Sequence, residues 1–556
     1  MAEPSRSLFL GQPRFSDRGL AALADTAGPE AAWRQAFAAQ GERAPAAATG
    51  DFAVGLVDAA SGTTFLAVDR FAVRTLCFRQ QGDRLLFAER ADELADASTP
   101  LDPQALFDYL YFHCIPSPRT IFQGVHRLPP GHCVRFADGR LTVQPYWVPH
   151  FEPQPGLRFE QAREEFRTLL RQAVARRLDG GTPACFLSGG TDSSTVAGMI
   201  GEAAGRPAAT YSIGFDAQGY DEMAFARIAA RHFRTEHHEY YVTPDDLVRG
   251  IPGVAAHYDQ PFGNSSALPA FYCAQLARSH GVTRLLAGDG GDELFGGNAR
   301  YAKQRVFGWY ESVPRALRSG LLEPLLSTGV ARRTPLVRKA ASYVEQARIP
   351  MPDRLQTYNL LQRLGMEAVL EPEFLRRVDR EGPLAQQRQV WRQAQARAAI
   401  DRTLAFEWRY TLAENDLPKV CGTTGLAGVQ VGFPMLDQDL VAFSMRLPPA
   451  YKLRGLKLRW FFKEALRGFL PDEILAKKKQ GFGLPFGVWA TQHAGLRALA
   501  RESLLGFAER GVVRPAFIGE LLDRRLAEHP GYYGEMVWIL MMAEQWLRRH
   551  APQARF

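Results

Sequence analysis

The sequence predicts an α/β protein of two domains, with an α+β domain over residues 1–148 and a parallel-sheet domain with a helical C-terminal part over residues 157–556. Short apolar runs separated by turn residues fill the first part, and strands alternate with helices after residue 157. Beyond about residue 300 the chain is mainly helical in pattern. A chain of 556 residues also exceeds what one ordinary core holds, so more than one domain is expected.

The first domain is predicted to be a β-sandwich. Its apolar runs cover residues 51–57, 63–68 and 84–88, and a Pro-Pro-Gly turn at 129–131 precedes a further strand at 133–136. Residues 148–156 are rich in proline and end on glycine, which is typical of a linker.

The second domain begins with a predicted helix over residues 159–177. An apolar strand at 184–187 follows, then a glycine-rich turn and a helix that includes residues 194–200. Further strands are predicted at 209–213 and 285–287. Strands and helices that alternate in this way favour a parallel sheet.

The composition limits the class of protein. Hydrophobic residues make up 46% and charged residues 23%, as in soluble globular proteins, and no apolar run is long enough to span a bilayer. The first residues lack a secretory signal, and the six cysteines are scattered without a CxxC pair, so we expect a reduced, cytoplasmic protein without a zinc site. The net charge of +8 comes without a recognition motif, so neither nucleic acid nor a membrane is an expected partner.

The segment Ser188-Gly-Gly-Thr-Asp-Ser-Ser194 lies between a predicted strand and a predicted helix. Glycines let the backbone approach an anion, and the helix start offers unpaired N–H groups and a positive dipole end. We therefore predict a phosphate-binding loop, in which Asp192 can hold Mg²⁺. The predicted nucleotide-binding residues of the loop are Ser188, Gly189, Gly190, Asp192, Ser193 and Ser194. The alternative is a glycine-rich turn that binds nothing.

This loop lacks the GxxxxGK[ST] pattern of a Walker loop and resembles the SGGxDS loop of the ATP pyrophosphatase superfamily. Other segments, in the same order, resemble signatures of one family, the asparagine synthetase-like proteins. These segments are residues 211–215, 221–222, 236–239, 257–262, 286–297, 434–437 and 479–483. The resemblance covers about residues 50–490. It implies a degenerate Ntn-type (N-terminal nucleophile) β-sandwich followed by an ATP pyrophosphatase domain, and an AMP-forming amide ligase that uses ATP and Mg²⁺.

The resemblance also implies roles for single residues. Asp192 and Asp292 would be the Mg²⁺ ligands. Lys479 would stabilise developing negative charge, and Asp289 would position the amine or accept a proton, unless it is only a structural aspartate. The positions that would border the adenosine are Leu187, Ile213 and Gly288. We expect Lys477 and Lys478 to be solvated, and Glu222 and Asp259 to be capping or ion-pairing residues if they are not functional.

The N-terminal domain departs from the family pattern. Glutamine-dependent members begin with Met-Cys, whereas residue 2 here is Ala and the first cysteine is Cys77. The family's NGEIYN segment is also absent, and the part before Gly50 is short. We therefore expect residues 1–148 to be a degenerate glutaminase-like domain without the catalytic cysteine and without glutaminase activity.

A second departure lies between residues 419 and 437. Cys421, Gly422, Gln430 and Gly432 stand where the family usually has Asp, Arg, Glu and Arg. Because the family places this region beside the substrate, the substrate is either not aspartate or held differently, unless activity is lost.

The leading hypothesis is an ATP-dependent amide ligase that joins a small-molecule or peptide carboxylate to an amine. Lasso-peptide cyclases and β-lactam synthetases are relatives that also lack the cysteine, so macrolactam formation on a precursor peptide is the first specific alternative. An asparagine synthetase fed by free ammonia is the second alternative, and a non-catalytic scaffold is the third. The sequence leaves the oligomeric state open, with a homodimer as one option.

Overall fold

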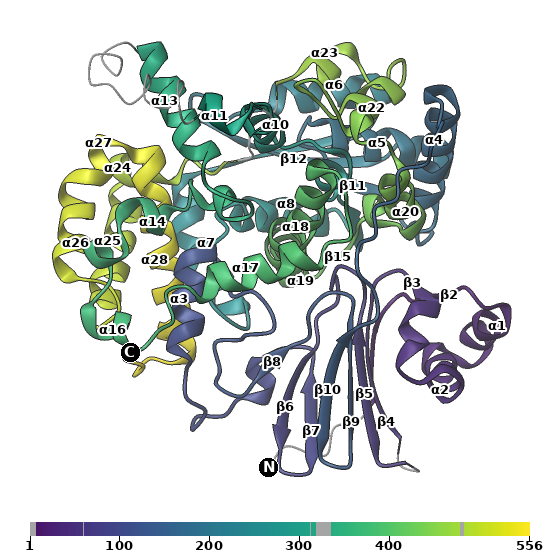
Figure 1. The fold of residues 1–556 in the computed structure, drawn as a ribbon, viewed down its shortest axis with the longest axis horizontal. Helices are drawn as coiled ribbons and strands as arrows, with labels where there is room; N and C mark the ends of the chain where they lie inside the picture. Colours follow the sequence, from purple (N-terminus) through teal and green to yellow (C-terminus); the bar gives the residue numbers. More distant parts are fainter. Residues whose placement is uncertain (1–6, 59–60, 312, 319–334, 479–482) are drawn as a thin grey trace.

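The computed structural model describes residues 7–58, 61–311, 313–318, 335–478 and 483–556. In Figure 1 the antiparallel strands of the N-terminal part stand at the bottom of the view. The rest of the chain lies above and beside them, as helices arranged around a parallel sheet. The α/β fold class predicted from the sequence is confirmed.

Two antiparallel sheets build the N-terminal part. The larger has the strand order β1 (Leu8–Gly11), β4 (Phe52–Asp58), β5 (Thr63–Val68), β9 (His132–Ala137) and β10 (Arg140–Pro145). The smaller has the order β7 (Arg84–Ala88), β6 (Cys77–Gln81) and β8 (His126–Arg127). Apolar side chains from both sheets, among them Leu66, Val134 and Phe87, form one core between them. This is the predicted β-sandwich.

A helical hairpin covers the outer face of the larger sheet. It consists of α1 (Arg18–Ala27) and α2 (Pro29–Gln40), and the sequence analysis did not predict it. Trp33 of α2 is buried, with its ring 4.9 Å from the ring of Phe52 on the sheet. The larger sheet therefore buries apolar side chains on both faces.

The second part contains a five-stranded sheet in which all neighbouring strands are parallel. Its order is β13 (Glu236–Val242), β12 (Ala209–Phe215), β11 (Ala184–Phe186), β14 (Arg284–Leu286) and β15 (Gln430–Gly432). Strands β11, β12 and β14 fall where the sequence predicted them. The edge strands β13 and β15 were not predicted, because β13 is largely polar and β15 has only three residues inside a helical region.

Helices cover both faces of this sheet. Apolar residues of α4 (Phe159–Ala175), α5 (Thr191–Ala204) and α6 (Met223–Phe233) share one core with Cys185 and Leu286. On the other face, α8 (Ala267–Ser279) packs on Ala184, Ala209 and Leu285. Because both faces of the sheet are buried, the central strands contain runs of apolar residues.

Helices account for most of the chain beyond residue 300, as predicted. The longer ones are α10 (Ala299–Glu311), α13 (Pro335–Ala347), α17 (Gly382–Gln393), α18 (Ala399–Glu407), the π-helix η6 (Trp408–Asp416), α19 (Leu417–Leu426), α20 (Gln438–Arg446), α25 (Ala494–Ala508) and α28 (Pro530–His550). A small hairpin of β16 (Leu453–Arg454) and β17 (Lys457–Leu458) leads into the short helix α22 (Trp460–Ala465). None of the helices in the described part of the chain combines the length and the apolar character needed to cross a bilayer.

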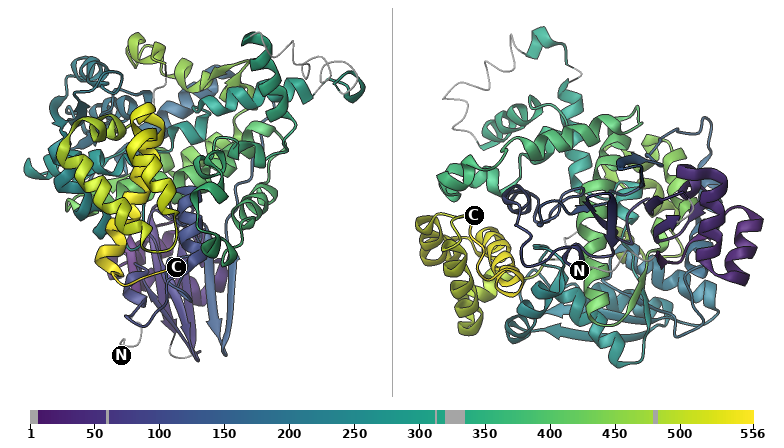
Figure 2. Two further views of the ribbon diagram at one scale, coloured as in Figure 1. Left: turned by 90° about the vertical axis from the view of Figure 1, so that its left-hand side faces the viewer. Right: turned by 90° about the horizontal axis from the view of Figure 1, so that it is seen from below.

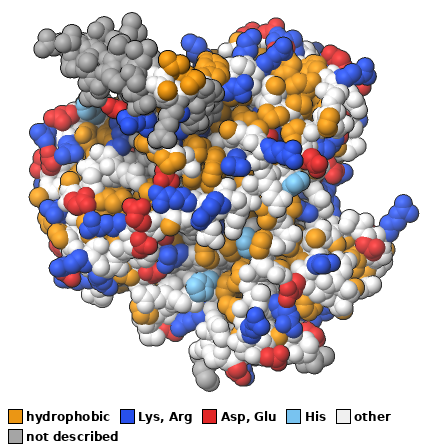
Figure 3. Space-filling view, viewed as in Figure 1, with side chains coloured by type: hydrophobic (Ala, Val, Ile, Leu, Met, Phe, Trp, Pro, Cys, Tyr) orange, Lys and Arg blue, Asp and Glu red, His pale blue; other side chains and the backbone are white. Residues whose placement is uncertain are grey.

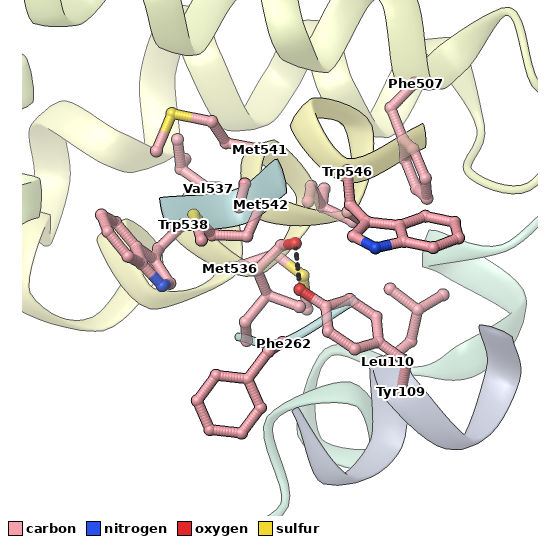
Figure 4. Packing of buried hydrophobic residues seen from close by; sticks show 14 of the residues in the cluster. Tyr109, Leu110, Phe262, Phe507, Met536, Val537, Trp538, Met541, Met542 and Trp546 are labelled. Atoms are coloured by element: carbon pink, nitrogen blue, oxygen red, sulfur yellow. Dashed lines mark hydrogen bonds between the residues drawn. The ribbon is translucent and has the colours of Figure 1, made fainter. Parts of the chain in front are cut away.

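The N-terminal part does not pack as an isolated unit. Its helix α3 (Pro103–Phe112) stands beside the C-terminal helices in Figures 1 and 2 and belongs to the same hydrophobic core as α28. Figure 4 shows the Tyr109 hydroxyl of α3 reaching α28, where it donates to the Ile539 carbonyl at 2.7 Å. Trp546 of α28 donates to the Tyr258 carbonyl at 2.9 Å, so the same helix also holds the parallel-sheet part.

A buried carboxylate joins the two parts at a second place. Asp437, at the start of α20, is 1% exposed and accepts hydrogen bonds from Arg14 at 3.0 Å and from Arg177 at 2.9 Å. Arg176 donates to its other oxygen at 2.8 Å. Burial alone would raise the pKa of Asp437, but these arginines hold it below its usual value.

A buried ion pair near the hairpin provides a test of this packing. Lys452, beside β16, donates to Asp401 of α18 at 2.6 Å, and neither side chain is appreciably exposed. We expect Lys452→Met to lower the free energy of unfolding by about 3–5 kcal/mol, because it leaves a buried carboxylate unpaired. Urea denaturation followed by circular dichroism measures the loss.

The double variant Lys452→Met/Asp401→Leu is the control. It removes both charges and should recover most of the stability, since apolar residues often replace a buried pair without loss. A double variant as unstable as the single one would contradict this account.

Candidate active site

The parallel sheet has its topological switch point between β11 and β14. From β11 the chain proceeds outward through β12 and β13, then returns to place β14 on the other side of β11. Ligands of open α/β sheets bind at this point, beyond the carboxyl ends of the strands. The loops that follow β11 and β14 are the two glycine-rich segments that the sequence singled out, and the sheet brings them together.

Gly288 shows how closely the two loops approach. A Cβ atom at this position would lie 2.8 Å from the Ser193 nitrogen and 2.9 Å from the Asp192 carbonyl carbon. These are backbone atoms that cannot move aside as a flexible side chain would. The loops can touch in this way because residue 288 has no side chain.

A cavity of about 900 Å³ opens beside the two loops. Most residues predicted for the site line it, and they come from three strand–loop segments. They are Leu187, Ser188, Gly190, Asp192, Ser193, Ile213, Gly288, Asp289 and Asp292. The volume lies near the upper end of the range for small-molecule sites, which is about 300–1,000 Å³.

Three of the predicted residues are not placed in the cavity. Gly189 has a φ of +69°, and a Cβ there would lie 2.4 Å from the Ala226 nitrogen, so this glycine allows the loop to pack on α6. Ser194 is fully buried, and its hydroxyl has no hydrogen-bond partner among the described residues. It lies outside the cavity lining, so its predicted role as a phosphate donor is not supported. Lys479 lies outside the described residues.

Hydrogen bonds fix the phosphate loop ahead of any ligand. The Ser193 hydroxyl accepts from the Ser188 backbone nitrogen at 3.1 Å and lies 3.0 Å from the Ser188 hydroxyl. Helix α5 starts at Thr191, so its free N–H groups and its positive end face the same region. The loop is therefore held in a shape that suits an anion.

Arg459 occupies the place between the two predicted metal ligands. Its Nη1 atom donates to Asp292 Oδ1 at 2.7 Å and to Asp192 Oδ2 at 2.9 Å. Its Nη2 atom pairs with Asp192 Oδ1, and Nη1 also donates to Thr191 Oγ1 at 2.8 Å. The Arg459 side chain is 6% exposed, and its guanidinium lies 4.0 Å from the centre of the Phe462 ring. The sequence analysis missed this residue, because an isolated arginine before a helix carries no motif.

The two carboxylates fit Mg²⁺ as part of its ligand set. Asp192 lies in the first turn of α5 and Asp292 in the first turn of the short helix α9 (Gly291–Phe295). Both line the cavity and both reach the same cation. Mg²⁺ prefers carboxylate and phosphate oxygens. Among the described residues no group of three or more His, Cys, Asp or Glu side chains forms a complete metal site, so phosphate oxygens and water would supply the other ligands.

A second group of charges lies in the cavity around Asp289. Lys419 Nζ is 3.5 Å from Asp289 Oδ1 and 3.0 Å from Asp416 Oδ1. Burial raises the pKa of Asp289, and the nearby Lys419 only partly offsets this. For Lys419, burial acts to lower the pKa, but Asp416 and Asp289 outweigh it and raise the pKa above its usual value, so Lys419 is charged. Neither Lys419 nor Asp416 was assigned a role from the sequence.

The position of Lys477 differs from the one expected from the sequence. It was expected to be solvated, but its side chain is 9% exposed and its Nζ lies 2.9 Å from Glu222 Oε1. The same ammonium is 4.6 Å from the centre of the Phe225 ring and donates to the Gly189 carbonyl at 3.4 Å. Lys477 and Glu222 both line the cavity, so this ion pair borders the phosphate loop. Lys478 is exposed, as expected.

The comparison with known proteins decides the family. Residues 165–548 match the family model described as asparagine synthase, and residues 32–147 match the glutamine amidotransferase domain. The chain belongs to the asparagine synthase family. Family membership makes it an ATP-dependent amide ligase in the general sense.

Three relatives illustrate the range of the similarity. Glutamine-hydrolyzing asparagine synthetase 1 of Bacillus subtilis (strain 168) is 25% identical over 494 residues, which is 86% of this chain and 74% of the relative. Glutamine-hydrolyzing asparagine synthetase 3 of the same organism is 24% identical, over 78% of this chain and 67% of the relative. Amidase chyE of Penicillium rubens is 25% identical, over 79% of this chain and 70% of the relative.

The four positions at which this chain departs from the asparagine synthase pattern lie outside the cavity lining. Cys421 points to the N-terminal part, with its sulfur 3.7 Å from the Val73 carbonyl oxygen. A Cβ at Gly422 would lie 2.5 Å from the Tyr258 ring. Gln430 is exposed and accepts from Arg284 at 2.6 Å, and Gly432 packs against Leu286.

Asp259 also acts away from the cavity. It accepts a hydrogen bond from the Ala91 nitrogen at 2.9 Å and pairs with Arg127 at 3.3 Å. Both partners belong to the N-terminal part, so Asp259 is an ion-pairing residue that joins the two parts of the chain.

The close approach of the two loops gives a direct test. We expect Gly288→Ala to lower ATP affinity by at least about tenfold, roughly 1.4 kcal/mol, because the new methyl group forces the loops apart. Isothermal titration calorimetry with a non-hydrolysable ATP analogue measures the affinity, and circular dichroism verifies the fold.

Gly201→Ala is the matched control. Gly201 lies on α5, and a Cβ there meets nothing within 4 Å. ATP affinity should stay unchanged, and stability should rise by up to ~1 kcal/mol because alanine favours a helix. Equal affinity in the two variants would show that the contact at residue 288 is not needed.

Proposed function

We propose that the chain is an AMP-forming amide ligase. It adenylates a substrate carboxylate with ATP, releases pyrophosphate, and transfers the acyl group to an amine with release of AMP. The observation that carries this proposal is the meeting of the two loops at the switch point, with Asp192 and Asp292 facing the same cavity.

Each wall of the cavity suits one part of this reaction. Leu187 and Ile213 offer apolar surface for the adenosine, and the start of α5 faces the phosphates. Arg459 and Lys477 border the phosphate loop. Their positive charges would stabilise the negative charge that develops when a carboxylate attacks the α-phosphorus. Mg²⁺ held by the two aspartates would neutralise phosphate oxygens and orient them for this attack.

The group around Asp289 suits the amine. Asp289 and Asp416 are 22% and 29% exposed and share one ammonium, that of Lys419, so together they keep a net negative charge beside the reacting carbonyl. An incoming ammonium is attracted there, and a carboxylate whose pKa is raised by burial can accept its proton. We assign Asp289 this role, with Lys419 as the residue that positions it.

The nitrogen source is proposed to be an amine other than that of glutamine. Cys77 and Cys133 are buried, and burial raises the pKa of their thiols to about 12 and about 11. Cys114 is buried as well, with its pKa raised by the same cause. None of these supplies a reactive thiolate in the described N-terminal domain. Residue 2, where the family has its nucleophile, lies outside the described residues.

A peptide carboxylate is the second candidate for the acyl substrate. The cavity is large enough to leave room beside a nucleotide, and Leu456 at its rim is 49% exposed. Leu456 would offer an apolar contact to a peptide that extends out of the cavity. Macrolactam formation on a precursor peptide is the specific reaction that this supports.

The free state of all six cysteines supports a cytoplasmic location.

ATP–pyrophosphate exchange with a panel of carboxylates tests the proposed chemistry. The panel contains aspartate, other amino acids, and short peptides with an Asp or Glu side chain. We expect at least one carboxylate to support exchange by the wild-type protein, and none to support it in Asp192→Ala, which lacks a metal ligand. ATP turnover that yields ADP and phosphate would contradict the AMP-forming reaction.

The proposed absence of glutaminase activity has its own test. Glutamine added to the purified protein, with and without ATP, should release no glutamate above the buffer background. Ammonium or the true amine should instead raise the AMP yield with the carboxylate found by exchange. Steady release of glutamate by the purified wild-type protein would overturn this part of the proposal.

A further inference from the structure

We propose that Arg459 is an internal cation that holds Asp192 and Asp292 together in the nucleotide-free protein and excludes a metal ion until phosphate draws the guanidinium away. This rests on the proposed function, since it takes these two aspartates as the metal ligands. It adds that metal and nucleotide bind together, and that metal alone is excluded by a residue of the chain itself.

Two glycines let the backbone approach the two carboxylates closely. A Cβ at Gly291 would lie 2.2 Å from Asp192 Oδ1, and a Cβ at Gly297 would lie 1.7 Å from Asp292 Oδ1. Any other residue at these positions would therefore occupy the space that the carboxylates need. The two negative charges are 20% and 17% exposed and would repel each other without a cation between them.

Arg459 is placed to be that cation. Its backbone has a φ of +53°, in the left-handed region that residues other than glycine seldom adopt. Its backbone nitrogen donates to the Gly296 carbonyl at 3.2 Å, which ties residue 459 to the end of the short helix that carries Asp292. Uncommon backbone conformations persist where the surroundings enforce them, and they gather at functional sites.

The arrangement gives the guanidinium two alternative sets of acceptors. A planar fork of N–H donors suits phosphate oxygens as well as carboxylates. Phosphates bound at the start of α5 would lie beside Thr191, which already accepts from Arg459 Nη1 at 2.8 Å. When the guanidinium turns to the phosphates, the two carboxylates lose their cation and become ligands for the metal. The affinities for metal and for nucleotide are therefore coupled, and the coupling is reciprocal.

The test measures metal binding without catalysis. Mn²⁺ serves as a probe for Mg²⁺, and electron paramagnetic resonance reports free Mn²⁺ during titration of the nucleotide-free protein. We expect Arg459→Gln to bind Mn²⁺ at least about tenfold more tightly than the wild type, within the usual range of such couplings. A non-hydrolysable ATP analogue should tighten Mn²⁺ binding by the wild type and do so much less in the variant. Equal Mn²⁺ affinity of the two proteins without nucleotide overturns the proposal.

Arg300→Gln is the matched control. Arg300 pairs with the buried Glu407 at 2.7 Å and does not line the cavity, so its loss also leaves a carboxylate unpaired. Its Mn²⁺ affinity should equal that of the wild type. A rise as large as that of Arg459→Gln would show that any lost arginine has this effect, and would overturn the proposal.

Arg459→Lys covers the case in which Arg459→Gln fails to fold. A lysine keeps the charge but lacks the fork that bridges two carboxylates, so Mn²⁺ affinity should rise less than in the glutamine variant. An affinity equal to that of the wild type overturns the proposal. The experiment does not require turnover, so a protein without ligase activity would still bind Mn²⁺ as expected here, and the two failures are distinguishable.

Discussion

The pairing of buried charges in the cavity is the constraint on which the site depends. Asp192 and Asp292 lie in the first turns of two helices, 100 positions apart in the sequence, and a single guanidinium bonds to both. Two carboxylates in a poorly solvated place require a cation, whether it comes from the chain or from a ligand. Arg459 meets this need in the protein as it stands, and its helix α22 and the hairpin before it are thereby fixed against the parallel sheet.

Other buried or half-buried ion pairs surround the site. Lys419 joins Asp289 and Asp416, Lys477 joins Glu222, and Lys452 joins Asp401 behind the hairpin. Farther away, Asp437 gathers three arginines where the N-terminal part meets the sheet. Apolar contacts supply most of the stability, but such pairs are directional and set which segments lie together. Figure 3 shows that acidic and basic side chains are intermixed on the face in view, without a single basic field.

The N-terminal part packs closely against the rest of the chain. Its helix α3 shares a core with α28, and its Arg127 pairs with Asp259 of the second part. These contacts join the N-terminal part both to the C-terminal helices and to the parallel-sheet part.

The sequence by itself determined the fold class, the central strands β11, β12 and β14, and the two glycine-rich segments that meet at the cavity. It could do so because strand-to-helix turns with glycine and acidic residues carry local signals, and because the signature segments occur in a fixed order. It did not reveal β13 and β15, the hairpin α1–α2, or the burial of Lys477. Edge strands carry only a weak hydrophobic pattern. The residues next to a lysine in a charged run do not show which distant group it pairs with.

Only the tertiary structure decided which charges meet. Arg459, Lys419 and Asp416 reach the site from segments far along the chain, and no spacing rule links them to the loops they contact. It also placed Ser194 outside the cavity lining, where its side chain is fully buried. The physical reason is the same in each case. Local sequence sets the loops and helices, whereas the position of a buried charge is set by the distant partner that offsets its desolvation.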